Sequence, residues 1–517
     1  MPNKKTTVLI VLDGWGYADP KRKGNVITPA TAPNYFSWLK KYPHNFLAAS
    51  GEAVGLFKGQ EGNSEAGHLN LGAGRVVKQD ALYISDAIKD GTFYKNNAFE
   101  QAVHHVQKYG TAVHVMGLLS NHNSGHSCPE HLYALLDYLH RMHVTKVFLH
   151  LFTDGRDSGQ HDAPVHYAKL EKYLHGNEQV ATVMGRYYAM DRNKIWDRTR
   201  LAYEALVLGK GTKVTSVSES ITRAYNKGET DEFIEPSVIT DKSGKPVATI
   251  KDNDAVFFFN LRSDRARQLT KAFVQPNLAR SANGDVFKRL KKPTNIRFVA
   301  MTDFGPDLPS VLTAYPSRDV ARSLTAVICP RPQLYVAESE KFAHVTYFFN
   351  GGYADKFCDE RRVKIDTPNI RNFADQPAMS ATAVGAVVRR GIESGDYDFI
   401  CANFANADMV GHAGNLAAGT KAVAVIDSEV AKIIDCLKKF GGQGIITADH
   451  GNIEDMINAT TGEIDTEHSV NPVPVILVAS QWPKVKLRKG KLADVAPTIL
   501  KLMGIKKPQV MTGKSLF

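Results

Sequence analysis

Short apolar runs alternate with amphipathic stretches along the whole chain, and this alternation predicts the strands and helices of parallel α/β sheets. Apolar runs predict strands at residues 7–12, 111–118, 146–152, 180–184, 255–260, 296–301, 345–350, 399–403, 444–448 and 473–478. Apolar positions at helical spacing predict helices at residues 129–141, 163–175, 196–207, 381–394 and 423–439. The fold class predicted from this pattern is α/β.

Carboxylate and imidazole side chains recur just after several of these strands. They are Asp13, Asp408, His412, Asp449, His450 and, further along the chain, His468. Any one of them alone is more often a capping Asp or a hydrogen-bonded loop His. Ligands of open α/β sheets, however, bind outside the carboxyl ends of the strands, so the recurrence indicates a metal site.

The spacing of these residues adds detail to that interpretation. Asp408 and His412 are four residues apart, so they point to one face if the segment is helical. Asp449 and His450 are adjacent and can share an ion only on an irregular turn, which Gly451 permits. Oxygen and nitrogen ligands without Cys favour Mn²⁺ or Zn²⁺ over a thiolate site, with Mg²⁺ as a further candidate.

The length of 517 residues predicts two domains. The chain carries 64 Lys plus Arg against 53 Asp plus Glu, a net charge of +11. Because no basic run is interleaved with aromatic residues, this excess favours small anionic substrates over nucleic acid. No apolar run is long enough to span a bilayer, and the first residues lack the pattern of a signal peptide.

The five cysteines are scattered and show no CxxC spacing, which is typical of reduced, packed thiols in a cytosolic protein. They are Cys128, Cys329, Cys358, Cys401 and Cys436.

Arginines follow the strands in the middle of the chain, whereas Asp and His follow those near the termini. The arginines are Arg156, Arg186, Arg192, Arg262 and Arg265. If Asp13 meets Asp408 and Asp449, both ends of the chain belong to one domain, residues 1–77 plus 317–517, and residues 78–316 form an inserted second domain. A cleft between an acidic metal domain and an Arg-rich domain would hold a phosphorylated acid.

A Gly-rich segment at residues 61–75 has Ser64 near its start. Asn63 or Ser64 could simply cap a helix. Alternatively, a hydroxyl at a helix N-terminus beside a metal ion can ionise and attack phosphorus. The metal ligands elsewhere in the chain make the nucleophile the leading hypothesis for Ser64.

The arginines also allow two interpretations. Most charge clusters are solvated surfaces, but these arginines follow apolar strands, and guanidinium groups match phosphate and carboxylate oxygens in pairs. The segment at residues 154–157 (DGRD) supplies a carboxylate near them, and His126 lies in a loop after another strand. His126 alone would be interpreted as structural.

Seven ordered motifs resemble the cofactor-independent phosphoglycerate mutases of the alkaline phosphatase superfamily. The motifs are residues 12–16 (LDGWG), 62–65 (GNSE), 154–157 (DGRD), 185–192 (GRYYAMDR), 408–412 (DMVGH), 447–452 (TADHGN) and 468–474, where His468 precedes NPVP. The resemblance runs along essentially the whole chain. It implies an alkaline-phosphatase-like metal-binding domain with an inserted substrate-binding phosphotransferase domain.

The resemblance also implies roles for individual residues. One Mn²⁺ would be held by Asp408, His412 and His468, and a second by Asp13, Ser64, Asp449 and His450, with Mg²⁺, Co²⁺ or Zn²⁺ as alternatives. Ser64 would accept the phosphoryl group, and Asp157 and Lys341 would be catalytic. The substrate would be bound by His126, Arg156, Asp157, Arg186, Arg192, Arg262, Arg265 and Lys341, the last lying before the strand predicted at residues 345–350.

The implied activity is interconversion of 3-phosphoglycerate and 2-phosphoglycerate in glycolysis and gluconeogenesis, through a phosphoserine and without 2,3-bisphosphoglycerate. The alternatives are a metal-dependent phosphatase or phosphodiesterase of the same superfamily, which would release phosphate, and an inactive anion-binding scaffold. We expect a cytoplasmic monomer whose partner is its small-molecule substrate, with no nucleic acid or membrane involved. Three positions depart from the family pattern, namely Cys128, Asn193 and Ser263.

Overall fold

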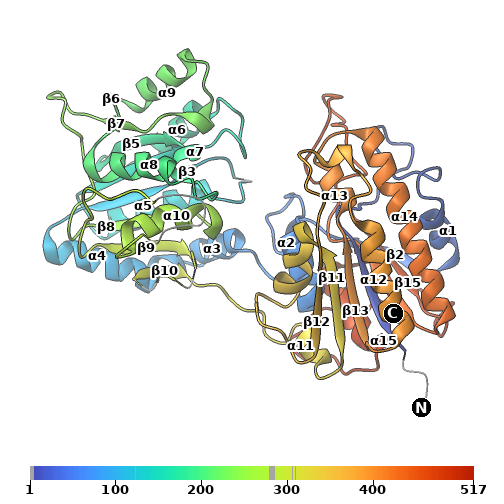
Figure 1. The fold of residues 1–517 in the computed structure, drawn as a ribbon. Helices are drawn as coiled ribbons and strands as arrows, with labels where there is room; N and C mark the ends of the chain where they lie inside the picture. Colours follow the sequence, from blue (N-terminus) through green and yellow to red (C-terminus); the bar gives the residue numbers. More distant parts are fainter. Residues whose placement is uncertain (1–4, 123, 279–285, 306, 309) are drawn as a thin grey trace. The chain divides into compact units, whose positions relative to one another are not determined.

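The computed structural model describes residues 5–122, 124–278, 286–305, 307–308 and 310–517. The chain divides into two compact units (Figure 1). Unit 1 comprises Met1–Gln79 and Arg318–Phe517, and unit 2 comprises Asp80–Ser317. Each unit has its own sheet and its own hydrophobic core.

Within the described residues, unit 1 contains an eight-stranded sheet. In spatial order its strands are β12 (Glu360–Ile365), β11 (Gln333–Glu338), β13 (Phe399–Phe404), β1 (Thr7–Leu12), β14 (Gln443–Thr447), β15 (Val473–Val478), β2 (His44–Ala48) and β16 (Gly490–Lys491). The central strand β1 is parallel to both of its neighbours, β13 and β14. All six residues of β1 are buried, as expected for a strand covered on both faces.

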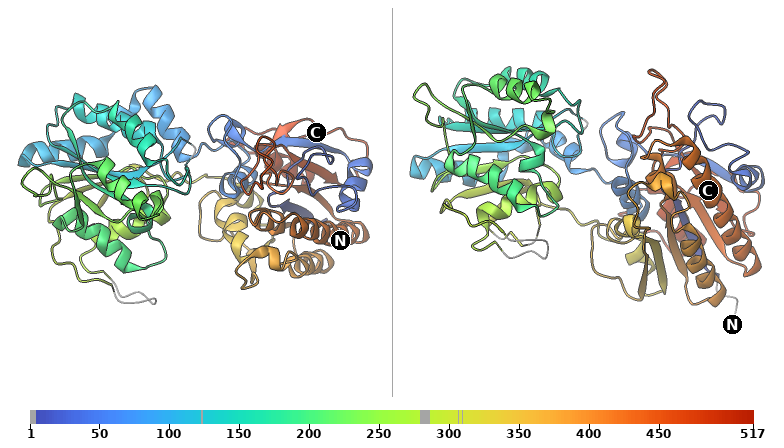
Figure 2. Two further views of the ribbon diagram at one scale, coloured as in Figure 1. Left: turned by 90° about the horizontal axis from the view of Figure 1, so that it is seen from above. Right: turned by 45° about the horizontal axis from the view of Figure 1, so that its top comes forward.

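Helices cover both faces of the unit 1 sheet (Figures 1 and 2). They are α1 (Pro33–Lys41), α2 (Ser64–Ala73), α11 (Leu324–Ile328), α12 (Ala381–Ser394), α13 (Asn406–Gly411), α14 (Leu416–Lys439) and α15 (Val495–Leu502). Helix α14 packs against α12 and α1, whereas α2 packs against α15 and α11. Short helical turns η1 (Gly51–Val54), η4 (Ser339–Lys341), η6 (Phe373–Asp375) and η7 (Leu492–Asp494) and the π-helix η5 (His344–Phe348) complete the unit.

The described part of unit 2 also has an eight-stranded sheet. Its spatial order is β10 (Val311–Tyr315), β9 (Arg297–Thr302), β8 (Ala255–Phe258), β3 (Val113–Leu119), β4 (Val147–Thr153), β5 (Glu178–Gly185), β7 (Ser237–Ile239) and β6 (Thr212–Val214). Its helical elements are α3 (Asp80–Lys89), η2 (Thr92–Lys95), α4 (Asn97–Tyr109), α5 (Pro129–Arg141), α6 (Ala163–Glu171), α7 (Arg186–Ala189), α8 (Trp196–Leu208), α9 (Val217–Asn226), η3 (Asp231–Phe233) and α10 (Ser263–Val274). Strands β3, β4 and β5 are parallel, so their carboxyl ends lie at one edge of the sheet.

The predicted α/β class is confirmed, and nine of the ten predicted strands are present. The strand predicted at 345–350 is wrong, because this aromatic run forms η5 and the strand of this region is β11, which was not predicted. Helices α5 and α12 have the predicted bounds. Helix α6 ends earlier than predicted and α14 begins earlier.

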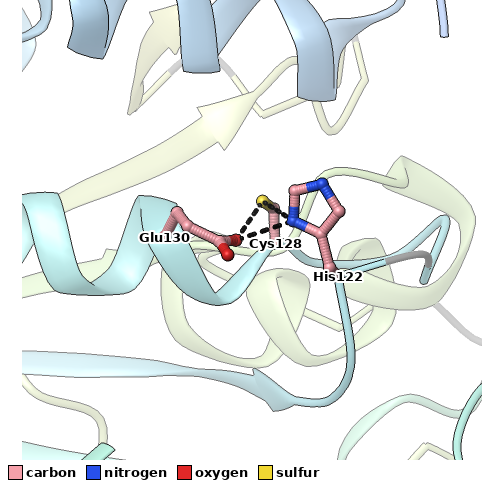
Figure 3. A group of neighbouring side chains, drawn as sticks. All are labelled: His122, Cys128 and Glu130. Carbon is pink, nitrogen blue, oxygen red and sulfur yellow. Dashed lines mark hydrogen bonds and ion pairs between the residues drawn. The ribbon is translucent and has the colours of Figure 1, made fainter. Parts of the chain in front are cut away.

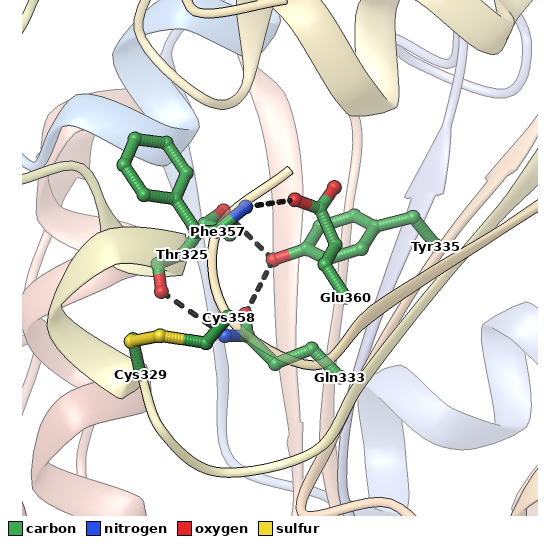
Figure 4. The surroundings of a disulfide bond; sticks show 7 residues. All are labelled: Thr325, Cys329, Gln333, Tyr335, Phe357, Cys358 and Glu360. Carbon is green, nitrogen blue, oxygen red and sulfur yellow. Dashed lines mark hydrogen bonds between the residues drawn. A yellow bond between two sulfur atoms is a disulfide. The ribbon is translucent and has the colours of Figure 1, made fainter. Parts of the chain in front are cut away.

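The prediction that all cysteines are reduced thiols is wrong for one pair. Cys329 and Cys358 form a disulfide with a Cα–Cα distance of 5.8 Å (Figure 4). They are 29 positions apart, which sequence spacing alone does not reveal, and the fold brings the end of α11 to the segment before β12. The other three cysteines are free and buried.

Among the described residues, no helix combines the length and the apolarity that crossing a membrane requires.

His150, in β4, is completely buried and must stay uncharged in the folded state. Its Nδ1 lies 2.9 Å from Thr182 Oγ1, and its Nε2 lies 2.9 Å from His114 Nδ1. Burial, with a smaller effect from His114, holds the pKa of His150 well below its ordinary value of 6.5. The unfolded chain therefore binds a proton below about pH 6.5 that the folded chain excludes, and stability is lost as pH falls through that value.

We expect His150 to make the free energy of unfolding of unit 2 fall by up to ~1.4 kcal/mol per pH unit below about pH 6.5. Denaturant unfolding at stepped pH measures this slope for wild type and for His150→Gln, which should show a shallower slope. His104→Gln, an exposed position on α4, is the matched control. Equal slopes for His150→Gln and wild type would contradict the prediction.

Candidate active site and metal centre

Three neighbouring parallel strands of unit 1 deliver carboxylates to one edge of the sheet. Asp13 follows β1, Asp408 lies in α13 just after β13, and Asp449 follows β14. All three side chains are buried. Because β1 pairs in register with both β13 and β14, their carboxyl ends meet and the acidic groups converge.

Lys341 lies at the centre of this acidic group. Its Nζ is 2.7 Å from Asp13 Oδ1 and 2.6 Å from Asp408 Oδ2. Burial disfavours the ammonium form, but Asp13 and Asp408 hold the pKa of Lys341 above its ordinary value. Lys341 ends the η4 turn after β11, so its predicted position before a strand is wrong, although the side chain reaches the site.

Lys341 in turn lowers the pKa values of the neighbouring carboxyl groups. Burial opposes ionisation of Asp13, yet the Lys341 ammonium and a hydrogen bond from His450 keep its pKa well below the usual range. Burial acts in the same way on Asp408, and Lys341 with the neighbouring imidazoles lowers its pKa. The site therefore holds ionised carboxylates, the form that a metal ion requires.

Ser64 is the first residue of α2, and its hydroxyl is directed into the same group. Its Oγ donates to Asp13 Oδ1 at 3.1 Å, lies 3.0 Å from His450 Nε2, and accepts from Lys341 Nζ at 2.8 Å. The cap of α2 is Asn63, whose side chain accepts from the backbone N–H of Ala66 at 2.8 Å. Asn63 thus serves the capping role, which leaves the Ser64 hydroxyl for chemistry.

His412 and His468 approach Asp408 from the outer side of the site. Their Nε2 atoms lie 3.0 Å apart, and each is close to Asp408 Oδ1, at 3.3 Å for His412 and 3.1 Å for His468. Their Nδ1 atoms face backbone carbonyl oxygens, of Thr466 at 2.7 Å and of Gly62 at 2.8 Å. A carbonyl on Nδ1 places the proton there and leaves Nε2 as a lone-pair donor, the usual arrangement of a metal-binding His.

Two sets of ligand atoms in this site are close enough to hold one ion each. They are Asp408, His450 and His468, and Asp13, Asp449 and His450, with His450 common to both. Asp449 Oδ2 is buried and has no hydrogen-bond partner in the described structure, although it lies 3.2 Å from His68 Nδ1. A buried carboxylate oxygen without a donor is costly, so a cation fits this position.

The prediction that the conformational freedom of Gly451 permits the turn at Asp449 and His450 is wrong. Gly451 does not have a positive φ. A Cβ at this position would lie 2.3 Å from Ser469 Oγ and 2.4 Å from Glu454 Oε1, so the glycine is required for close packing.

In unit 2, buried Arg186 begins α7 directly after β5 and is held by carboxylates that follow β4. Its Nη1 donates to Asp154 Oδ1 at 2.5 Å and to Asp157 Oδ1 at 3.1 Å. Ser124 Oγ donates to the other oxygen of Asp157 at 2.6 Å. Burial opposes ionisation of Asp157, but Arg186 and Ser124 keep its pKa below the usual value.

A second group in unit 2 forms around Asp264 in α10. Its two oxygens lie 2.8 Å from Arg192 Nη1 and 3.5 Å from Arg262 Nε. Arg265 instead donates from Nη1 to the Met190 carbonyl at 3.3 Å. Four of the predicted anion-binding arginines, Arg186 included, therefore come from the segments that contain α7 and α10.

His126 is buried, and its backbone carbonyl accepts from the Leu261 N–H at 2.8 Å. Burial is the main cause that lowers the pKa of His126 to about 3, with Asp157 opposing and Arg186 and Arg262 assisting the shift. Arg156 pairs through its Nε with Glu232 Oε1 at 2.9 Å, and its side chain is half exposed, as is that of Arg192.

Several positioning residues were not predicted. Asn403 Nδ2 donates to Asp13 Oδ2 at 2.6 Å, and His68 Nε2 lies 3.0 Å from the same nitrogen. Asp154 and Asp264 orient the arginines. Three of these residues lie in sequence segments that already contain predicted site residues, and this could have identified them. Asp154 begins the segment 154–157, Asp264 lies between Arg262 and Arg265, and His68 lies in the Gly-rich segment 61–75.

Comparison with known proteins gives consistent results. The family model described as "BPG-independent PGAM N-terminus" matches residues 84–306. The chain is 47% identical to 2,3-bisphosphoglycerate-independent phosphoglycerate mutase 2 of Methanosarcina barkeri, over 99% of this chain and 98% of that protein. It is 45% identical to the 2,3-bisphosphoglycerate-independent phosphoglycerate mutase of Clostridium acetobutylicum, over 99% of each. A crystal structure of Leishmania mexicana phosphoglycerate mutase at low cobalt concentration aligns with a TM-score of 0.79 and 29% identity, covering 99% of this chain and 98% of that chain.

Proposed function

Since the chain belongs to the 2,3-bisphosphoglycerate-independent phosphoglycerate mutases, we propose that Ser64 carries the phosphoryl group between the two oxygens of glycerate. The protein is an isomerase that interconverts 3-phosphoglycerate and 2-phosphoglycerate. The observation that supports the role of Ser64 is the position of its Oγ, which contacts Lys341, Asp13 and His450 at the start of a helix. An ammonium and a helix N-terminus both stabilise an ionised hydroxyl.

We assign two in-line transfers to this site. In the first, the Ser64 Oγ–P bond forms while the bond from phosphorus to the 3-oxygen of glycerate breaks. In the second, the 2-oxygen of glycerate forms its bond to phosphorus and the Ser64 ester breaks. Ser64 would release its proton to solvent when it ionises before the first transfer and take one back from solvent after the second, so the enzyme returns to its starting state.

Lys341 would offset the charge that develops on the transferring oxygens, because its ammonium already contacts Ser64 Oγ. Asp157, whose pKa is lowered, would accept the proton from the 2-hydroxyl of glycerate and pass a proton to the 3-oxygen. Arg186 and Arg192 would bind the glycerate carboxylate, Arg262 and Arg265 the phosphate, and His126 and Arg156 the remaining substrate oxygens.

We propose that the site depends on divalent metal and holds two Mn²⁺ ions, with Mg²⁺, Co²⁺ or Zn²⁺ as weaker candidates. Asp408, His412 and His468 would hold one ion, and Asp13, Ser64, Asp449 and His450 the other. Bound ions would act as Lewis acids toward the developing negative charge. The oxygen and nitrogen donors of the site match the preferences of these ions.

Conversion of 3-phosphoglycerate by purified protein, with Mn²⁺ and without 2,3-bisphosphoglycerate, tests this function. We expect 2-phosphoglycerate to appear with little free phosphate. Radiolabelled glycerate added to the medium should not enter the product, because the intermediate glycerate is retained. Release of phosphate without isomer exchange would identify a phosphatase instead.

We further propose that the substrate draws the two units together. The proposed nucleophile belongs to unit 1 and the proposed carboxylate-binding arginines belong to unit 2, and exclusion of water would protect the phosphoserine from hydrolysis. Small-angle scattering should therefore give a smaller radius of gyration with 3-phosphoglycerate than with an equal concentration of sulfate. Identical profiles in both solutions would refute the closure.

A glycolytic reaction and a small-molecule substrate favour a cytoplasmic monomer that acts apart from nucleic acids and membranes.

A further inference from the structure

A cluster of three different potential ligands lies in unit 2, outside the residues assigned to the mutase reaction. His122, Cys128 and Glu130 converge between the end of β3 and the first turn of α5 (Figure 3). Glu130 Oε2 lies 2.9 Å from Cys128 Sγ and 3.0 Å from His122 Nδ1. The remaining pair, Cys128 Sγ and His122 Nδ1, is 3.9 Å apart.

These separations suit coordination of a single ion. Zinc binds thiolate sulfur at ~2.3 Å and imidazole nitrogen or carboxylate oxygen at ~2.0–2.2 Å, so the edges of a tetrahedral site are about 3.4–3.6 Å long. The observed separations of 2.9, 3.0 and 3.9 Å bracket that range. One ion between the three atoms therefore requires only small side-chain rotations.

The backbone already orients two of the three ligands. Cys128 is the N-cap of α5 and Glu130 lies in the first turn of that helix, so one rigid element places both side chains. Burial and the neighbouring Glu130 carboxylate raise the pKa of the Cys128 thiol, with the backbone N–H groups of Glu130 and His131 acting weakly in the opposite direction, so an ion must displace the thiol proton to bind. Cys128 is buried, whereas the side chains of His122 and Glu130 are 47% and 53% exposed, so one side of the cluster is open to water.

We propose that His122, Cys128 and Glu130 form an additional metal site that binds a thiophilic divalent ion such as Zn²⁺, with water as the fourth ligand. Binding would break the hydrogen bond from the Cys128 thiol to Glu130 and release the thiol proton to solvent. The thiolate and the carboxylate would then neutralise the charge of the ion. A sulfur ligand selects Zn²⁺ or Co²⁺ over Mn²⁺, which distinguishes this site from the oxygen and nitrogen centre of unit 1.

The ion would also join the two ends of a loop that serves the proposed substrate site. Between His122 and Cys128, Ser124 holds Asp157 at 2.6 Å and accepts from the His126 N–H at 3.1 Å. A bound ion would therefore restrict the segment that positions His126 and Asp157. The binding itself is independent of whether these residues have the roles proposed for them.

Titration of the full-length protein with Co²⁺, after saturation of unit 1 with Mn²⁺, tests the proposal. Because the unit 1 centre contains no cysteine, thiolate-to-Co²⁺ charge-transfer absorption reports only a cysteine ligand. We expect this absorption to rise to one equivalent of Co²⁺ and to be reversed by Zn²⁺. No charge-transfer absorption in the wild type would overturn the proposal.

Matched variants locate the signal. Cys128→Ser should abolish the absorption, whereas Cys436→Ser should retain it. Cys436 is a matched control because it is also buried near a carboxylate, with its Sγ 4.0 Å from Glu393 Oε1. It belongs to none of the ligand clusters among the described residues. His122→Gln changes a half-exposed side chain, so the protein should fold and bind Co²⁺ about tenfold or more weakly. Absorption that persists in Cys128→Ser, or an affinity unchanged in His122→Gln, would refute the site.

Discussion

Ser64→Ala is expected to give a folded protein whose mutase rate is at least about a thousandfold lower than that of the wild type. The substitution removes the proposed acceptor of the phosphoryl group, the Oγ that Lys341 Nζ contacts at 2.8 Å. Alanine fits the first turn of α2, and Asn63 still caps the helix, so the loss should not come from unfolding. Initial rates of 2-phosphoglycerate formation with Mn²⁺ give the rate, and circular dichroism gives the fold.

The serine control is Ser50→Ala, whose exposed hydroxyl donates to the Val470 carbonyl at 3.1 Å. It should react at close to the wild-type rate, since it removes one hydrogen bond at the surface. Mass spectrometry of acid-quenched wild type during turnover should place a phosphoryl group on the peptide that contains Ser64. A phosphoryl group on another residue, or near-normal turnover by Ser64→Ala, would remove Ser64 from the mechanism.

The part of the site that follows strand ends could be predicted from the sequence. Asp13, Asp408 and Asp449 each come after a buried apolar run, and parallel strands bring their carboxyl ends to one edge of a sheet. The helical spacing of Asp408 and His412 was equally informative, since both approach one point through α13. Periodicity and fold class are sufficient for these residues because their positions depend on regular structure.

Residues placed by irregular segments could not be predicted in the same way. Lys341 and Ser64 are 277 positions apart, and no spacing rule indicates that their side chains meet. The aromatic run after Lys341 has the composition of a strand, but its residues pack as the π-helix η5, with the strand of this region at β11. The apolar composition of this run predicts that it is buried, but whether it forms a strand or a helix depends on tertiary packing.

The carboxylate partners of the arginines could not be predicted from the sequence either. Their positions after strands predicted an anion-binding group, but not which carboxylate would orient each guanidinium. Arg186 pairs with Asp154, and Arg192 pairs with Asp264, which lies 72 positions away. Arg156 pairs with Glu232 on η3, an element that the sequence pattern did not reveal. Residue type predicted the chemistry of this group, and the fold determined its partners.

Removal of divalent ions with EDTA is expected to abolish mutase activity, and added Mn²⁺ should restore it. Asp13, Asp408 and Asp449 are all buried around the single ammonium of Lys341, so bound cations relieve repulsion among the carboxylates. An ion at a hundredfold excess over its dissociation constant also stabilises the folded state by ~2.7 kcal/mol. Calorimetry should therefore show that Mn²⁺ raises the unfolding temperature of unit 1 and leaves that of unit 2 nearly unchanged.

A pair of Asp→Asn variants separates ligand loss from a general effect of charge. Asp408→Asn weakens an acceptor in the proposed centre and should lose both the activity and the thermal shift with Mn²⁺. Asp435→Asn removes the same charge from α14, where the side chain is 76% exposed and pairs with Lys438, and should keep both. Full activity after exhaustive chelation, or an undiminished Mn²⁺ shift in Asp408→Asn, would show that these carboxylates surround Lys341 for stability alone.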